Sequence, residues 1–317
     1  MSSVVTDRSA AIASEPLRPA GPRRGFATGT VSSIRDLVAQ RELLGMLVRR
    51  ELKARYKDSA AGFLWSLGRP LAMLLIYYLA LGQFLGAARS VVDFAIFIYA
   101  GLTAWGFYSE AILAGTGSVV ANAGLVKKIY LPREIFPLSA VGSALFNFGV
   151  QLVVLVLATI VVGKFPVGDD WVYFPLALAV LVVFATAMSL ILSAVNVYLR
   201  DVQYLVDIFI MVFFWLSPIV YLWSFVRDAL LDTTMSPATQ ELVMNIYLSN
   251  PITLAVIGFQ ETFWAAGDGV HPETKVPYAH VPDLALRLGI ALAVGILLLW
   301  VAQRIFTRLQ ANFAQEL

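Results

Sequence analysis

WVYFPLALAVLVVFATAMSLILSAVNVYL, residues 171–199, is a stretch of the chain without a single charged side chain. A helix needs about 20 predominantly apolar residues to cross the hydrocarbon core of a bilayer. A run of this length and composition therefore predicts a membrane-spanning helix. Outward from it, the same criterion predicts five more spans, at residues 71–88, 94–121, 136–163, 202–223 and 284–303. The sequence thus predicts an all-α integral membrane protein with six transmembrane helices.

The composition excludes a soluble globular protein. Hydrophobic residues make up 59% of the 317 residues and charged residues only 14%, whereas soluble domains carry about 25% charged residues. The absence of cysteine excludes disulfides, thiol catalysis and cysteine metal sites. Only two histidines occur, His271 and His280, which argues against zinc chemistry. The net charge of +2 gives no sign of a nucleic-acid partner.

Basic residues are distributed unequally between the two faces of this six-span topology. Eighteen of the 23 Lys and Arg residues fall on the face that carries both termini. Because basic loops stay on the cytoplasmic side of a membrane, both termini are predicted to be cytoplasmic. Residues 1–40 are rich in Ser, Ala, Pro and Arg and are predicted to form a disordered cytoplasmic tail. An interface helix and linker, 41–66, and a six-helix transmembrane domain, 67–317, follow.

The connection between the fifth and sixth spans, residues 224–283, is the one long external segment. Within it, the apolar run 252–259 follows Asn250-Pro251 and is too short to cross the membrane. Such a run predicts a short re-entrant or interfacial helix on the external side, lining a vestibule.

Residues 41–57 have the pattern of an amphipathic helix. Apolar side chains recur every four residues at Leu44, Val48 and Leu52, beside a stripe of basic side chains. Such a helix lies in the membrane interface, with its basic side toward anionic headgroups and the cytosol. It is either a plain anchor before the first span or a surface that also meets a cytosolic partner. Trp65 then suits the interface, and Pro70 suits the first turn of the first span.

Four motifs occur in a fixed order along the chain. The first is Tyr56-x-x-Ser-x-x-Gly-x-x-Trp-x-x-x-x-Pro70, and the second is Asn122-Ala-Gly-Leu-Val-Lys-Lys-Ile-Tyr-Leu-Pro-Arg-Glu-Ile-Phe-Pro137. The third pairs Arg200-Asp-Val with Ser217-Pro-Ile-Val-Tyr, and the fourth is Asn250-Pro251. Together they resemble the membrane subunits of type-2 ABC exporters, especially the polysaccharide-exporting subgroup. The resemblance covers about residues 41–317, whereas residues 1–40 are unmatched and Gln260-Glu261 departs from the pattern.

The resemblance implies a bacterial inner-membrane permease that exports a polyprenyl-linked polysaccharide, such as O-antigen, teichoic acid or cell-wall galactan. It also implies a homodimer, surrounded by membrane lipids, with two copies of a nucleotide-binding ATPase subunit. The chain contains no Gly-x-x-x-x-Gly-Lys-Ser/Thr motif, so it does not hydrolyse ATP through a P-loop. ATP and Mg²⁺ are expected on the partner, with no cofactor on this chain and no enzymatic activity of its own.

The loop after the second span has two interpretations. Its basic residues could serve only to keep the loop in the cytoplasm. By resemblance, its short helix is a coupling helix that docks into a groove on the ATPase. The residues expected to make that contact are Lys127, Lys128, Pro132 and Arg133.

The gate and the pore are predicted from basic and aromatic residues. Substrate is expected to enter from the inner leaflet beside the interface helix, where basic residues attract a pyrophosphate headgroup or simply snorkel. These gate residues are Arg49, Arg50, Lys53, Trp65 and Arg69. Aromatic rings stack on sugar faces, but they also form ordinary packing and membrane belts. The candidate pore residues are Tyr77, Tyr99, Trp105, Tyr108, Trp215, Tyr221 and Trp223, with an external constriction near Pro218.

Two acidic residues lie within predicted spans, Glu110 and Asp207. An intramembrane acid is costly and is a functional-site candidate. Glu110 is either such a site or a hydrogen-bonded contact between helices or subunits. Asp207 is expected to be paired, with Arg200 or with water.

Two alternative functions remain open at this stage. A permease for drugs or small lipids would have a narrower and less aromatic pore. An ATP-independent flippase or membrane enzyme would require ionisable groups in several spans, and only Glu110 and Asp207 are clear cases.

Overall fold

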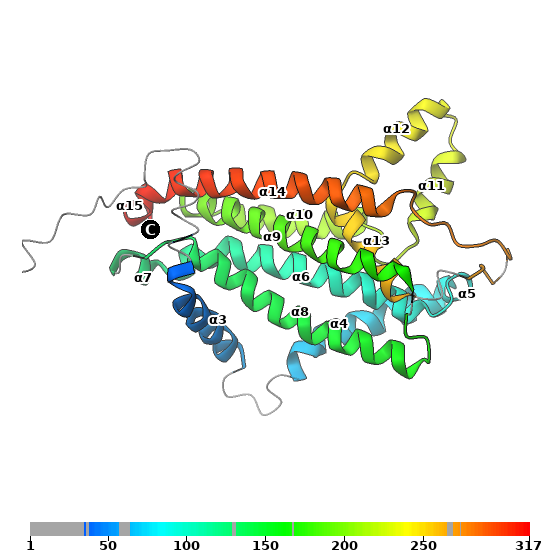
Figure 1. The fold of residues 1–317 in the computed structure, drawn as a ribbon, viewed down its shortest axis with the longest axis horizontal. Coiled ribbons are helices and arrows are strands. Elements are labelled where there is room, and N and C mark those ends of the chain that lie inside the picture. Colours follow the sequence, from blue (N-terminus) through cyan, green and yellow to red (C-terminus); the bar gives the residue numbers. More distant parts are fainter. Residues whose placement is uncertain are drawn as a thin grey trace, which may run out of the picture.

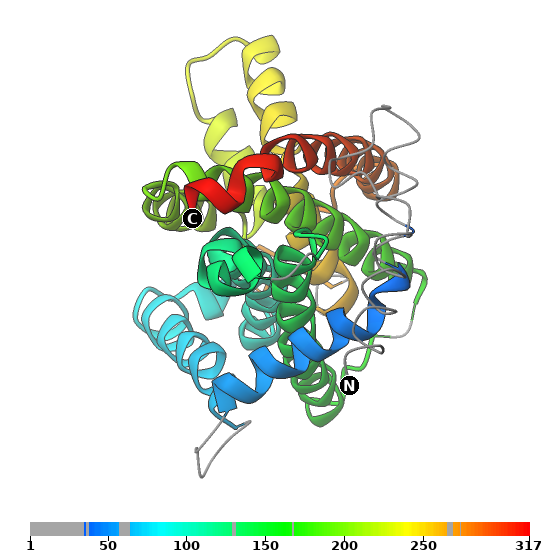
Figure 2. The ribbon, with the colours of Figure 1, turned by 90° about the vertical axis from the view of Figure 1, so that its left-hand side faces the viewer.

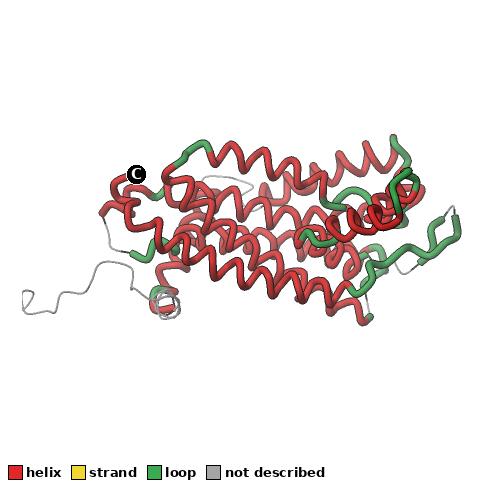
Figure 3. The backbone as a smooth tube through the Cα atoms, turned by 90° about the horizontal axis from the view of Figure 1, so that it is seen from above, coloured by secondary structure: helices red, strands yellow, loops and turns green. Residues whose placement is uncertain are grey.

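The computed structural model describes residue 35 and residues 38–56, 64–128, 131–166, 168–264, 269–272 and 274–317. These residues form an elongated bundle of helices, with no strand among them (Figure 1, Figure 3). Most of the predicted tail, 1–40, lies outside the described residues. The all-α prediction is confirmed.

Four long helices make up the bundle: α6 (Phe94–Ala121), α8 (Ile135–Val161), α9 (Tyr173–Tyr198) and α14 (Leu284–Leu309). All four are long and apolar enough to cross a membrane, and they coincide with four of the predicted spans. α6 is the central helix, packed against α8, α9 and α10, and 72% of its most apolar window is buried. Because neighbouring helices surround α6, hydrophobic residues occur on all of its faces.

The other two predicted spans are shorter apolar helices in the structure. α4 (Leu64–Tyr77) continues into a π-helix, η1 (Tyr78–Phe84), and a single-turn helix, α5 (Ala87–Ser90). α10 (Val202–Leu216) has 15 residues. Neither matches the length of a straight full crossing, so the count of six spans stays a prediction. Pro70 lies inside α4 and not, as the sequence predicted, at its start. A proline is tolerated within a membrane helix where neighbouring groups satisfy the backbone carbonyl that it leaves without a hydrogen bond.

Three helices occur among the described residues between α10 and α14. Elsewhere, the single 3-10 turn η2 (Asp169–Val172) precedes α9. α11 (Trp223–Leu231) and α12 (Pro237–Tyr247) project from the bundle (Figure 1, yellow). The axis then bends by 79° into α13 (Pro251–Phe263), so the α12–α13 pair is a broken span or a re-entrant loop and a fifth candidate crossing. The short helices predicted here are confirmed.

α13 begins where the sequence predicted and lies deeper than predicted. The Asn250 side chain accepts a hydrogen bond from the Ile252 backbone N–H at 3.0 Å, and Pro251 occupies the first helical position. Asparagine caps and first-turn prolines are favourable helix starts. The helix packs against α9, α6 and α14 and is almost wholly buried. It is therefore part of the core and not the wall of an open vestibule.

The opposite end of the bundle, here called the α7 end, gathers segments from the whole chain. It contains α3 (Arg41–Tyr56), α7 (Ala123–Lys128), the turn η4 (Gln310–Asn312) and α15 (Phe313–Glu316). Figure 2 looks onto this end and shows α3 crossing the bundle. A second hydrophobic cluster, separate from the main core, joins these elements through Leu47, Val126, Ile135, Phe136, Val197, Phe306 and Phe313. We call it the end cluster.

Candidate functional site: the α7 end and the aromatic seam

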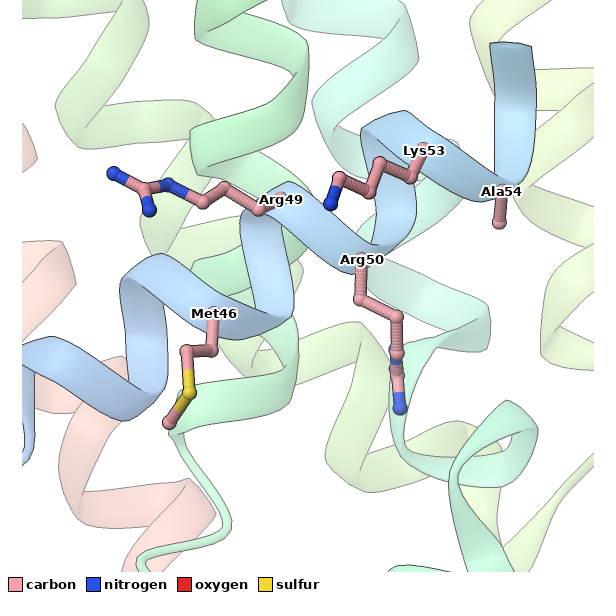
Figure 4. Close-up of a pocket in the computed structure, with 5 residues that line it drawn as sticks. All are labelled: Met46, Arg49, Arg50, Lys53 and Ala54. Carbon is pink, nitrogen blue, oxygen red and sulfur yellow. The ribbon is translucent and has the colours of Figure 1, made fainter. Parts of the chain in front are cut away.

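α3 is amphipathic in the structure as the sequence predicted. Leu47 is buried in the end cluster, with Leu43 and Leu44 packed beside it. The opposite face is exposed and forms a surface pocket of about 460 Å³, shown in Figure 4. The residues that line it are Met46, Arg49, Arg50, Lys53 and Ala54. Three of the five predicted gate residues therefore share one exposed basic surface, and Trp65 and Arg69 have side chains outside the described part of the structure.

Glu51 attaches α3 to α8. One carboxylate oxygen accepts a hydrogen bond from the Ser139 hydroxyl at 2.7 Å, and the other from the Ser143 hydroxyl at 3.0 Å. Both serines are buried, and they lie one helical turn apart. Val48 of α3 also lies close to Gly142 of α8: a Cβ added at this glycine would be 3.0 Å from a Val48 methyl group. The sequence prediction did not include Glu51.

The two serines belong to a polar stripe on α8. Ser139, Ser143, Asn147 and Gln151 recur every four residues, and each is at most 5% exposed. Residues at this spacing share one face of a helix, which here points toward α3 and α6. Hydrogen bonds between buried polar groups of membrane helices stabilise packing. The i, i+4 spacing is visible in the sequence and is the signal that would have found the stripe.

Glu110 connects three helices. Its carboxylate accepts a hydrogen bond from the Asn147 amide at 2.6 Å and forms an ion pair with Arg55 of α3. The Glu110 side chain is 25% exposed. Of the two interpretations from sequence, this geometry supports the hydrogen-bonded contact between helices.

Arg50 provides a further link between α3 and the bundle. Its guanidinium donates to the Asn122 side-chain oxygen at 2.6 Å, immediately before α7. Asp207, by contrast, makes no ion pair within the described part of the chain and is exposed on α10. Its expected pairing with Arg200 is therefore not seen.

The four predicted coupling residues separate into two environments. Lys127 and Lys128 are exposed in the last turn of α7, where a partner protein can reach them. Pro132 is half-buried, and Arg133 turns inward. The Arg133 guanidinium donates to the Gln310 backbone carbonyl and lies 5.8 Å from the centre of the Phe313 ring.

Glu134, which the sequence prediction omitted, is a buried acid in the same corner, only 4% exposed. Burial raises the pKa of its carboxyl group above the ordinary value, and this outweighs the lowering by hydrogen bonds and by Arg133. The Gln310 amide donates to this carboxyl group at 3.5 Å. The corner therefore holds a polar group whose charged form is disfavoured.

Predicted aromatic pore residues from three helices meet in one seam. The Tyr77 ring of α4 stacks on Phe214 of α10 at 5.7 Å between ring centres. Trp105 of α6 lies 5.8 Å from Phe214 and 6.0 Å from Tyr108. Trp215 lies 5.4 Å from Phe214 and is 55% exposed. We call these five residues the aromatic seam.

The other three predicted aromatic residues lie outside the seam. The Tyr221 hydroxyl donates to the Trp215 backbone carbonyl at 2.9 Å, which keeps it next to the seam. Tyr99 and Trp223 are buried, at 2% and 7% exposed, and the Trp223 indole donates to the Ala279 carbonyl at 3.0 Å. In this conformation Tyr99 and Trp223 serve the packing of the bundle.

Beside the seam, α10 presents an apolar surface that no other described element covers. Its exposed side chains are Leu205, Ile208, Phe209, Met211, Val212, Trp215 and Leu216. Leu75 and Ile76 on α4 are also more than half exposed. A surface of this size marks a contact with lipid or with another protein.

The long apolar helices define a polytopic membrane protein, and the α7 end presents exposed basic side chains. Residues 42–231 match the family described as ABC-2 type transporter, and this match covers more than half of the chain. The chain belongs to the ABC-2 type transporter family, as its motifs suggested.

Curated relatives cover most of the chain. It is 29% identical over 284 residues to an O-antigen export system permease protein of Myxococcus xanthus, covering 90% of this chain and 98% of the relative. A protein of the same name from Klebsiella pneumoniae is 27% identical, covering 87% and 95%. The polysialic acid transport protein KpsM of Escherichia coli is 22% identical, covering 68% and 86%.

Proposed function

We propose that the chain is the transmembrane subunit of an ATP-driven exporter that moves a lipid-linked polysaccharide across the inner membrane of a bacterium. The observation that carries the proposal is the family membership, together with relatives of nearly full length named for O-antigen export. The cargo would be of the O-antigen, teichoic acid or cell-wall galactan type. The aromatic seam supports a glycan, since sugar faces stack on aromatic rings.

ATP hydrolysis is assigned to a separate nucleotide-binding subunit, which carries ATP and Mg²⁺ and is present in two copies. Lys127 and Lys128 project from the α7 end and are the groups that would dock on it. Exposed lysines at this end also support a cytoplasmic position for α7 and for both termini. The apolar helices then form a multi-pass inner-membrane domain of six spans, with α4–η1 and α10 as the shorter two.

A second copy of this chain is the proposed partner of the α10 surface. Asp207 lies within that surface, next to Ile208 and Phe209. A carboxylate facing lipid is costly, whereas one facing a protein-lined pore is tolerated. In a homodimer with α4 and α10 at the twofold axis, Trp215, Tyr221 and the partly exposed Tyr77 and Tyr108 would border the pore. The Trp105 and Phe214 rings of the seam, 6% and 8% exposed, would pack behind them.

The basic surface of α3 is the proposed substrate gate. Arg49 and Lys53 are exposed over the pocket in Figure 4, and α3 is fixed to the bundle on its other side. Arginine and lysine bind phosphate groups. A polyprenyl pyrophosphate in the inner leaflet would therefore meet α3 before entering the pore, near Trp65 and Arg69.

Charge reversal at α7 tests the proposal. The double variant K127E/K128E is expected to lower export at least tenfold, because it reverses the charge of the groups that dock on the nucleotide-binding subunit, while the variant still reaches the membrane. Export is measured as surface glycan labelled with a membrane-impermeant reagent, in cells that carry the variant in place of the native gene. K275E, which reverses an exposed lysine at the other end of the molecule, is the matched control. Unchanged ATP-driven export in K127E/K128E would contradict the coupling role.

A further inference from the structure

The last eight residues of the chain, 310–317, fold back onto the α7 end as η4 and α15. Phe313 is completely buried, and Leu317 packs against the same end cluster. Isolated helices shorter than about 12 residues are marginal in water, so tertiary contacts must hold the four residues of α15 in place. In Figure 1, α15 and α7 lie at the same end of the bundle.

On one side, Phe313 contacts the ends of α9 and α14. Its ring lies edge-on to Phe306 of α14, with 5.5 Å between ring centres, and 6.1 Å from Tyr198 of α9. The Tyr198 hydroxyl also donates to the Leu309 backbone carbonyl at 2.6 Å. The tail is thus fixed to two of the long helices of the bundle.

On its other side, the tail holds the corner that follows α7. The Arg133 guanidinium lies 5.8 Å from the centre of the Phe313 ring and donates to the Gln310 carbonyl. Gln310 also donates to the buried Glu134 carboxyl group. A cation over an aromatic face is stabilised, more so where water is excluded. Val126 of α7 belongs to the same end cluster.

We infer that Phe313 is a positioning residue for the coupling loop. It joins the Arg133 corner, and with it the exposed lysines of α7, to the ends of α9 and α14. A push on α7 is then transmitted to the long helices instead of bending the loop. The inference rests on the proposed coupling function of α7, and it assigns to the C-terminal tail a part in transmitting the ATPase stroke.

The position of α7 can be measured directly, because the chain has no cysteine. Spin labels are attached to G124C on α7, where an added Cβ meets nothing within 4 Å, and to R308C, an exposed position on α14. Pulsed EPR on the complex with the nucleotide-binding subunit gives the distance distribution. F313A is expected to at least double its width, and F313L, which keeps most of the buried volume, to preserve it. Q315A, at an exposed position of the same tail, is the matched control.

Export per ATP hydrolysed gives the functional result. F313A is expected to lower this ratio at least fivefold with an unchanged KM for ATP, and F313L to restore it at least halfway to the native value. A loss of fold alone would lower ATP hydrolysis and export together and leave the ratio unchanged. Where F313A does not assemble, F313V, which removes the ring but keeps part of the buried volume, is expected to broaden the distances and lower the ratio about twofold.

The variant K127E/K128E distinguishes a failure of the proposed coupling function from a failure of the role inferred for Phe313. If K127E/K128E leaves export unchanged, the proposed coupling function fails. If K127E/K128E abolishes export but F313A keeps both the narrow distances and the native ratio, the role of Phe313 is overturned. Native behaviour of F313V, in the case where F313A does not assemble, overturns it equally.

Discussion

The ion pair between Arg55 and Glu110 provides the sharpest test of how α3 is held on the bundle. The substitution E110Q keeps the side-chain volume and an oxygen that can accept from Asn147. It removes the negative charge, and with it the attraction of Arg55. α3 keeps the bonds of Glu51 to its two serines and of Arg50 to Asn122. The variant therefore weakens one of the polar links without removing the others.

The size of the effect follows from the exposure of the pair. Hydrogen bonds to charged groups contribute about 1.5–3 kcal/mol where they are protected, and exposed ion pairs about 0–1 kcal/mol. The Arg55 side chain is 44% exposed and that of Glu110 25%, which places this pair near about 1 kcal/mol. A loss of that size shifts the equilibrium between docked and undocked α3 about fivefold.

Cysteine modification measures this equilibrium. Leu47 lies on the face of α3 that packs against the bundle and is only 5% exposed. A maleimide therefore reaches the thiol of L47C only when α3 leaves the bundle. Adding E110Q to L47C should raise the modification rate about fivefold, and R55Q should raise it at least as much. The double variant should differ little from R55Q alone, because R55Q already removes the ion pair that E110Q removes.

The ion pair between Lys164 and Asp93, at the other end of the bundle, provides the control: K164Q should leave the rate unchanged. The reasoning would be refuted if L47C/E110Q were modified within about twofold of the rate of L47C alone. It would also be refuted if E110Q and R55Q together raised the rate by about 25-fold, the product of two independent effects.

Two further predictions concern packing and pH. An added Cβ at Gly115 would lie 2.4 Å from Ser189 Oγ, so G115A should cost about 1–3 kcal/mol through overpacking of α6 against α9. Thermal unfolding in detergent should show a lower midpoint, with G149A as a control because nothing lies within 4 Å of its added Cβ. Burial raises the pKa of Glu134, so its stabilising protonated form is lost as the pH rises through that pKa. E134Q should therefore unfold at a higher temperature than the native protein at neutral pH, and the difference should vanish below the ordinary value of 4.5.

The long helices were predictable because their signal is local. A run such as 171–199 contains no charge, and a backbone in hydrocarbon has few alternatives to a helix. The amphipathic pattern of α3 and the Asn250-Pro251 helix start were predictable for the same reason. Residue spacing and capping chemistry are properties of a few neighbouring residues.

The features that the sequence did not reveal depend on partners far away in the chain. Arg133 was expected to face a second protein, but the Phe313 ring and the Gln310 carbonyl, nearly 180 residues later, draw it inward. Glu51 was not part of any sequence prediction, because only the fold brings Ser139 and Ser143 beneath it. The depth of α13 likewise depends on the walls that α6, α9 and α14 provide.

The burial of α13 has a consequence for the order in which the protein can be completed during synthesis. Eleven of its thirteen residues are buried, and an added Cβ on Gly258 would lie 3.0 Å from Ala177 and 3.4 Å from Leu288 of α14. The ribosome makes α14 after α13, so α13 lacks one of its walls until the last helix has entered the membrane. A chain that stops before residue 284 leaves this apolar segment unpaired. We therefore expect such a fragment to lack the native packing of α13 against α14.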